Sequence, residues 1–234
     1  MGPYLYLAAA PSEAVRVPTL TQPEGVRQFL ENPPRTRHNG WNLVTLDRAR
    51  LIGGNRLRVS NGERKHVDLV DDGTMLAIGA FSGFLGWGRW VFTERPKVNG
   101  LAVIEFAYDF CVFYEELLAQ YVEPRPARVR FAVGVRHAHY ATDEGAEKRL
   151  YLSPGPIGDL YDFDEYEREE APASEFSSTF DFDVGENRPH FVVGAVAYSL
   201  VRRFYNWFGH TDDAVPYTNE LRTEIDVERI RNLN

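Results

Sequence analysis

Two histidines on one expected strand are the most chemically suggestive pair in the sequence. His137 and His139 are separated by one residue, a spacing that places both imidazoles on the same face of an extended strand. Asp143 or Glu144, a few residues further on, could add an oxygen ligand to a metal ion. The pair is therefore a candidate metal site and, with a metal bound, a candidate hydrolase centre. The alternative is a pair of unliganded histidines at a strand end.

A second candidate is a basic run in an otherwise acidic protein. Between 35 and 65 only Asp47 and Glu63 carry negative charge. The run predicts a positively charged sheet surface for phosphate, nucleic acid or an acidic protein segment. The alternative is an ordinary solvent-facing side of a sheet, with the cations paired to Asp68, Asp71 and an acidic segment further on. The candidate binding residues are Arg35, Arg37, Trp41, Arg48, Arg50, Arg56, Arg58, Arg64 and Lys65.

Two groups of acids could hold Mg²⁺ or Ca²⁺, at 162–165 and at Asp181-Phe182-Asp183. The first group lacks the glycine and the terminal glutamate of a calcium-binding loop. The second lies on the polar side of an alternating strand. Solvated faces explain both groups, so neither is assigned a metal.

Motifs that name a reaction are absent from the sequence. The glycines at 83–88, "GFLGWG", have the wrong order for a dinucleotide fingerprint, and there is no GK[ST] phosphate loop. Ser82 lacks the upstream glycine of a nucleophile elbow, and HExxH does not occur. Cys111 stands among large apolar residues and is expected to be a packed thiol. We assign no catalytic residue and no cofactor.

A set of aromatic residues could line a ligand groove or fill a core or dimer contact, because Trp and Tyr combine a large apolar area with a polar group. The set is Trp87, Trp90, Tyr205, Trp207 and Phe208.

Composition limits the class of protein. With 234 residues, 44% of them hydrophobic, the chain can bury one sizeable core or two small ones. A net charge of −8 argues against coating nucleic acid through bulk charge, so any anionic partner must be met locally. A single cysteine excludes an intrachain disulfide framework. No apolar run reaches the roughly 20 residues of a membrane span. We expect a cytoplasmic chain with no membrane contact.

The elements that must position these residues are readable from periodicity. We expect a strand over 4–10, a short helix over 23–31, and an antiparallel meander over about 41–80. Its turns are marked by glycine and asparagine at 53–55, 61–62 and 72–73. The segment 81–92 is expected to make an irregular turn and then a strand.

Two long apolar helices are expected at 101–122 and 189–208. Alternation predicts strands at 128–136 and 176–184, separated by an acidic insertion at about 142–175, and the polar tail predicts a short strand and helix or an exchanged arm. The fold class is α+β, an antiparallel meander plus additional strands packed with two long apolar helices. We expect one domain over 1–234, or two packed halves at 1–122 and 123–234.

The opening "PYLYLAAAPSEAV", the helix "PEGVRQFL" and the glycine-punctuated meander ending in a long helix form a recognisable layout. Over about the first 120 residues it resembles the C-terminal regions of bacterial Schlafen-like proteins that carry an AlbA_2 domain, a predicted DNA-binding module. The resemblance implies that the AlbA_2 module precedes this chain and that the chain is an accessory part or fragment. It transfers no catalytic or DNA-contacting residue.

The leading functional hypothesis is a non-enzymatic interaction or ligand-sensing domain of a bacterial regulatory or defence protein. Its two helices carry more apolar surface than one sheet face readily covers, which predicts a homo-oligomer or a protein partner. The alternatives are a module that binds nucleic acid or phosphate through the basic run and a metal-dependent hydrolase at His137 and His139.

Overall fold

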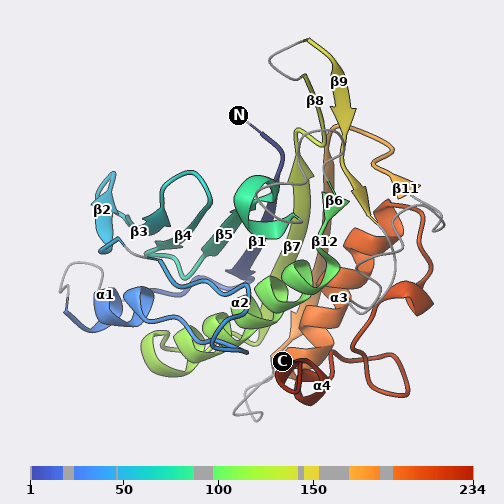
Figure 1. Cartoon of the computed structure of the whole chain (residues 1–234). Helices are drawn as coiled ribbons and strands as arrows, with labels where there is room; N and C mark the ends of the chain where they lie inside the picture. The colour runs from blue at the N-terminus through green and yellow to red at the C-terminus, as the bar shows by residue number, and fades with distance from the viewer. Residues whose placement is uncertain are drawn as a thin grey trace.

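The computed structural model describes residues 2–17, 24–45, 47–86, 97–141, 145–152, 169–184 and 192–233. Its fold is α+β, as the sequence predicts, with one large sheet and helices gathered beside it (Figure 1). No helix in these ranges is both long enough and apolar enough to cross a membrane.

The large sheet has seven strands, all paired antiparallel. From one edge to the other they are β12 (Phe176–Asp183), β7 (Arg128–Arg136), β1 (Tyr4–Pro11), β5 (Met75–Ala80), β4 (Lys65–Val70), β3 (Arg56–Asn61) and β2 (Arg50–Ile52). Strand β1 pairs with β5 on one side and β7 on the other. The first and second halves of the chain therefore contribute to one continuous sheet.

Strands β2 to β5 form the predicted meander, and glycine permits its turns. Gly53 and Gly54 have φ angles of 64° and 85°, Gly62 has 55°, and Gly73 has 80°. A side chain at these angles would be strained, whereas glycine adopts them freely. The meander begins at Arg50, so the expectation of strand structure from 41 is wrong for the first part of that range.

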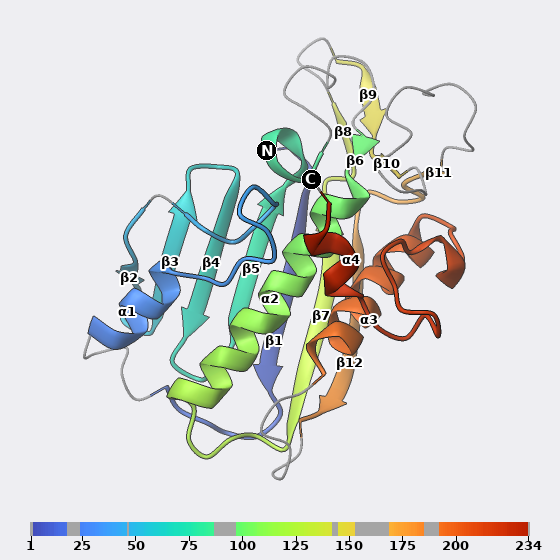
Figure 2. The same ribbon diagram turned by 60° about the horizontal axis from the view of Figure 1, so that its bottom comes forward.

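The helices lie on one side of this sheet. They are α1 (Glu24–Glu31), α2 (Gly100–Tyr121), α3 (Val193–Trp207) and α4 (Val227–Arg231), and Figure 2 shows all four in front of the same face. Both predicted long helices are present. Asn99 begins α2, its side chain accepting a hydrogen bond from the Ala102 backbone N–H at 3.1 Å.

The long helix α2 is enclosed within its own chain. Its side chains are buried around most of its circumference, including the carboxylates Glu105 and Asp109. The sheet, α3 and the segment 36–41 surround it. The apolar surface of α2 is therefore covered within the described chain and does not argue for a dimer.

Smaller elements lie at one end of the sheet. Residues Phe81–Leu85 form an irregular turn, η1, closed by the Gly86 N–H, which donates to the Phe81 carbonyl at 2.8 Å; an irregular turn is expected at the start of this segment. The rest of the strand expected up to residue 92 lies outside the described residues. Strands β6 (Lys97–Val98), β10 (Tyr151–Leu152) and β11 (Glu169–Glu170) form a three-stranded sheet, and β8 (His139–Ala141) pairs with β9 (Glu147–Arg149).

Much of the acidic insertion, including the acids at 162–165, also lies outside the described ranges. The C-terminal tail folds on its own chain, with a 3₁₀ turn η3 (Asp212–Ala214), a bridge from Thr218 to Ile225, and α4. The Ile225 backbone N–H donates to the Gly194 carbonyl at 3.0 Å, which attaches the tail to α3.

Tyr6 packs closely against Gly134 on the sheet face away from the helices. Tyr6 of β1 lies directly opposite Gly134 of β7. A Cβ atom built on Gly134 would lie 2.2 Å from the Tyr6 Cζ. The tyrosine ring therefore lies against the sheet, in the space that a side chain at 134 would occupy.

We expect Gly134→Ala to reduce the free energy of unfolding by about 1–3 kcal/mol, the usual cost of overpacking. Alanine normally improves a strand position occupied by glycine, so a loss identifies the Tyr6 overlap. Guanidinium titrations measure this loss in the wild type, in each single variant and in the Tyr6→Ala/Gly134→Ala double variant. The loss should shrink in the Tyr6→Ala background, and an equal loss in both backgrounds would contradict the explanation.

Candidate interaction site

The predicted basic set does not form one surface, because the sheet divides it between two faces. Lys65 shares the helix-side face of β4 with Val67 and Leu69, and Arg37 reaches the same side from the loop after α1. Arg56 and Arg58 point to the opposite face of β3, because Leu57 and Val59 point toward the core. Arg50 lies directly opposite Arg58 and so joins that face. Arg35, Arg48 and Arg64 are exposed.

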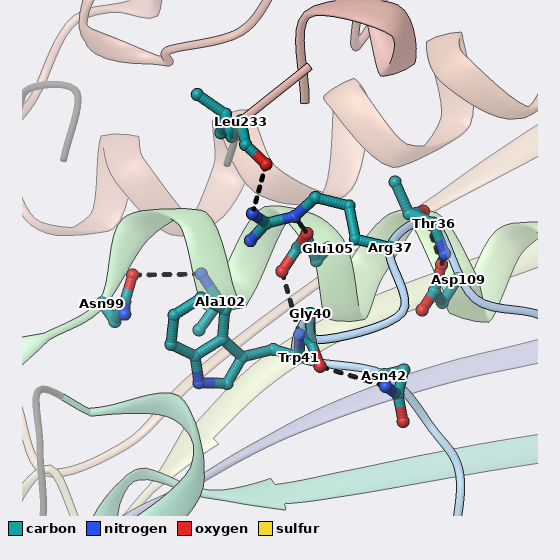
Figure 3. A network of polar contacts seen from close by, with 10 residues as sticks. All are labelled: Thr36, Arg37, Gly40, Trp41, Asn42, Asn99, Ala102, Glu105, Asp109 and Leu233. Atoms are coloured by element: carbon teal, nitrogen blue, oxygen red, sulfur yellow. Dashed lines mark hydrogen bonds and ion pairs between the residues drawn. The ribbon is translucent and has the colours of Figure 1, made fainter. Parts of the chain in front are cut away.

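On the helix side, two carboxylates of α2 hold the segment 36–41. Glu105 accepts from Arg37 Nε at 2.5 Å and from the Trp41 backbone N–H at 2.9 Å (Figure 3). One turn further on, Asp109 Oδ1 accepts from both the backbone N–H and the hydroxyl of Thr36, at 2.8 and 2.6 Å. Two of the candidate binding residues, Arg37 and Trp41, thus help to fix this segment to α2.

The same network holds the C-terminal end of the chain. Arg37 Nη1 donates to the Leu233 carbonyl at 3.2 Å, on the other side of the guanidinium from Glu105 (Figure 3). Gly40 lies so close to the Glu105 carboxylate that a Cβ there would be 2.8 Å from Oε1. The arginine therefore joins three parts of the chain that are remote in sequence.

Lys65 is the buried cation of this network. Its ammonium donates to the Asn42 carbonyl at 2.6 Å and lies 4.7 Å from the centre of the Phe84 ring. Burial lowers the pKa of Lys65 to about 8, against the opposing effect of Asp109. Burial also raises the pKa of Asp109 to about 7, although the Thr36 hydrogen bonds oppose the rise.

Perturbed pKa values of this kind occur at catalytic sites and also in structural ion networks. Here the side-chain oxygens and nitrogens are directed at backbone groups of the segment 36–42. This arrangement supports a structural role.

On the opposite face, Arg56 and Arg58 converge on one carboxylate. Arg58 donates from Nε and Nη2 to the two oxygens of Asp68, at 2.5 and 2.6 Å, and Arg56 Nη1 lies 3.4 Å from Oδ2. Asp68 is 1% exposed beneath them. The sequence alternative of arginines paired to Asp68 therefore describes these two residues. Burial and the charge of Arg58 lower the pKa of His66 beside them, which favours its neutral form.

Between the charged groups, the centre of this face is apolar. We define the outer face by the residues that β12, β7, β1, β5, β4 and β3 direct away from the helices. Its central side chains are half-buried, and no helix in the described ranges covers them (Figure 2). They are Tyr4, Tyr6, Ala8, Leu76, Ile78 and Ala132.

The far side of the outer face carries further ion pairs. Arg130 Nε donates to Asp181 at 2.8 Å and Arg128 Nε to Asp183 at 2.9 Å, while Arg136 pairs with Glu175. Asp181 and Asp183 lie on the polar side of β12, as the sequence predicts. An apolar centre with polar margins is the anatomy of a protein-binding surface.

Sequence reasoning missed this site, although β1 carries a signal for it. Its residues are apolar toward both faces: Leu5, Leu7 and Ala9 point into the core, whereas Tyr6 and Ala8 point outward. Apolar residues on both faces are typical of strands that are covered on both sides.

The two histidines do not converge on one point. The His137 ring makes an edge contact with Tyr4, with centroids 5.8 Å apart, and its backbone φ of 57° turns it out of the strand. His139 Nε2 is 2.8 Å from the Ala171 carbonyl, and Nδ1 is 3.9 Å from Glu147. Within the described part of the chain, no group of three or more His, Cys, Asp or Glu could hold a metal. The residues 142–144 lie outside it, so the metal site stays a prediction.

The aromatic set and the cysteine are largely core residues. Tyr205 and Phe208 are buried, and Trp207 stacks on Phe176 with centroids 5.1 Å apart. Trp87 and Trp90 lie outside the described residues. Cys111 is a buried free thiol whose pKa is raised by burial, as expected of a packed residue.

Comparison with known proteins finds no family model, no curated protein and no solved structure that matches the chain. The Schlafen-like resemblance therefore stays a prediction.

We expect Glu105→Ala to lower the free energy of unfolding by about 3–5 kcal/mol, because it leaves the Arg37 guanidinium and the Trp41 N–H without their acceptor in a buried site. Glu116→Ala is the matched control on the same helix, where the side chain is only half-buried, and its effect should stay within about 0.5 kcal/mol. Chemical denaturation of both variants provides the comparison. Equal small losses would show that Glu105 does not hold the loop.

The raised pKa of Asp109 predicts a pH-dependent stability. The folded state holds this proton more tightly than the unfolded state, so the stabilising contribution is complete below about pH 4. It is lost as the pH rises through the folded-state value of about 7. Asp109→Asn keeps an oxygen for Thr36 but cannot ionise.

Unfolding free energies of the wild type and the Asp109→Asn variant, measured at several pH values between these limits, test this. The wild type should lose stability relative to the variant as the pH rises. A difference that does not vary with pH would contradict the raised pKa.

Proposed function

We propose that this chain is a non-enzymatic protein-interaction domain that binds a partner protein through the outer face of its large sheet. The observation that supports the proposal is the one-sided placement of α1 to α4, which leaves Tyr6, Leu76 and Ile78 without a helical cover in the described structure. Apolar surface of this kind in a folded domain is typical of contact with another molecule.

The chemistry of the face indicates the kind of partner. Its apolar centre suits apolar side chains, and aromatic residues such as Tyr6 are enriched in binding hot spots. Arg56 and Arg58 together share one acceptor, Asp68, so this margin keeps an excess of positive charge. The partner that fits best presents an apolar centre with an acidic margin.

The alternatives receive less support from the geometry. A phosphate-binding surface would need its cations together and available, whereas Arg37 and Lys65 lie on the helix side and Arg58 is bidentate to Asp68. Binding to nucleic acid nevertheless has its own signature, a steep fall in affinity with added salt. The regulatory or defence context and the cytoplasmic location rest on the sequence and stay proposals.

A photo-crosslinking amino acid at Ile78 tests the proposed face, with the same group at Leu221, 82% exposed on the C-terminal tail, as the control. Ile78 should capture one defined protein that Leu221 does not. With that protein purified, Ile78→Asp should weaken binding about 30-fold, the effect of a hot-spot residue, while Leu221→Asp leaves the affinity unchanged.

Circular dichroism establishes that both aspartate variants fold. Crosslinks that do not differ between the two positions would contradict the proposal. Binding of duplex DNA that falls steeply with salt would favour the nucleic-acid alternative instead.

A further inference from the structure

Strand β12 ends the large sheet and is long for an edge strand. Its eight residues pair with β7 on one side, and no other described strand pairs with it (Figure 2). The opposite edge, β2, has three residues. An edge strand presents backbone donors and acceptors that can pair with another strand.

The phase of the β7–β12 ladder shows which backbone groups face outward. The Val184 N–H donates to the Ala127 carbonyl at 2.9 Å, in the same register as the strand pairs. Hydrogen-bonded residues alternate along an antiparallel pair, so Phe182, Phe180, Ser178 and Phe176 face β7. The outward N–H and C=O groups therefore belong to Ser177, Thr179, Asp181 and Asp183. Within the described ranges, no backbone group of another segment bonds to them.

The edge lacks the net charge that commonly protects edge strands from association. Its acids, Asp181 and Asp183, are each paired with an arginine of β7, at 2.8 and 2.9 Å. The remaining side chains are phenylalanine, serine and threonine, which favour extended structure.

We propose that β12 is a self-association edge, to which β12 of a second copy of this chain adds in antiparallel orientation. In the register with Phe180 at the two-fold axis, all four outward residues of each copy are hydrogen-bonded. Ser177 then lies opposite Asp183 of the second copy, and Thr179 lies opposite Asp181. Each carboxylate meets a hydroxyl, and the two Phe180 rings meet at the axis.

The neighbouring registers are disfavoured by charge. A shift that centres the pair on Thr179 places Asp183 opposite Glu175 of the second copy. A shift that centres it on Asp181 places that residue opposite itself. Like charges directly opposite each other destabilise a strand pair, so the Phe180-centred register is selected.

The position of the helices is compatible with pairing through β12. Helix α3 already covers the inner side chains of β12, with Arg203 4.2 Å from the centre of the Phe180 ring and Trp207 stacked on Phe176. A two-fold axis perpendicular to the sheet places the helices of both copies on the same face. The inference concerns a different surface from the outer face and stands independently of the proposed function.

Light scattering coupled to size exclusion, over a range of micromolar concentrations, measures the assembly. The wild type should have twice the mass of one chain. Thr179→Pro removes an outward N–H without removing a bond to β7, and proline is tolerated on edge strands, so this variant should be a folded monomer. Thr179→Val keeps the N–H and should stay a dimer. A monomeric wild type would overturn the proposal.

A cysteine pair tests the register directly. This test does not depend on whether the proline variant folds. Phe180→Cys places two cysteines in a non-hydrogen-bonded pair with Cα atoms about 4.5 Å apart, within disulfide reach. Under mild oxidation it should form a covalent dimer, while Thr179→Cys should not, because that residue faces Asp181 of the second copy. A dimer in which Phe180→Cys fails to crosslink, or in which Thr179→Cys crosslinks instead, would overturn the proposed pairing.

Discussion

The structure depends on enclosing α2, a helix that is apolar around most of its circumference. The sheet covers only one side of such a helix, so other segments must cover the rest, and α3, the loop after α1 and the C-terminal tail do so. Covering it also buries the carboxyl groups of Glu105 and Asp109, which need hydrogen-bond partners. The segment 36–41 supplies these partners from its backbone N–H groups and from Arg37. The loop is thus ordered by the polar requirements of an otherwise apolar helix.

Enclosing α2 collects the helices on one face and leaves the other face to strand side chains. On that face, Tyr6 fills the space above Gly134, and Leu76 and Ile78 lie beside it on β5. The charged residues at the margins are mostly paired in place, since Asp68 takes two arginines and Asp181 takes one. Many arginines in this acidic chain therefore form ion pairs between strands. The apolar centre of the outer face is the part that would gain most free energy from burial against a partner.

The regular elements were predictable because their side chains repeat with the period of the structure. Residues 128–136 place Val129, Phe131, Val133 and Val135 at every second position, and the turn glycines mark each reversal of the meander. The loop network was not predictable, since Thr36 and Arg37 meet carboxylates 73 and 68 residues away and nothing local encodes such pairs. Lys65 was assigned to a basic surface from its charge, although its alternation with Val67 and Leu69 already placed it inward. For Lys65, the alternation of side chains along the strand predicted the side of the sheet better than its charge did.

The outer face and the β12 edge would bind through different interactions, apolar contact at the face and backbone hydrogen bonds at the edge. Apolar contact is non-directional, so a face alone fixes a partner's position poorly. Backbone pairing is directional, and with the acids of β12 it selects one register. A dimer joined through β12 would hold two outer faces side by side on one continuous sheet. A partner with two matching surfaces would then gain affinity from the second contact at high effective concentration, without any new interaction within either site.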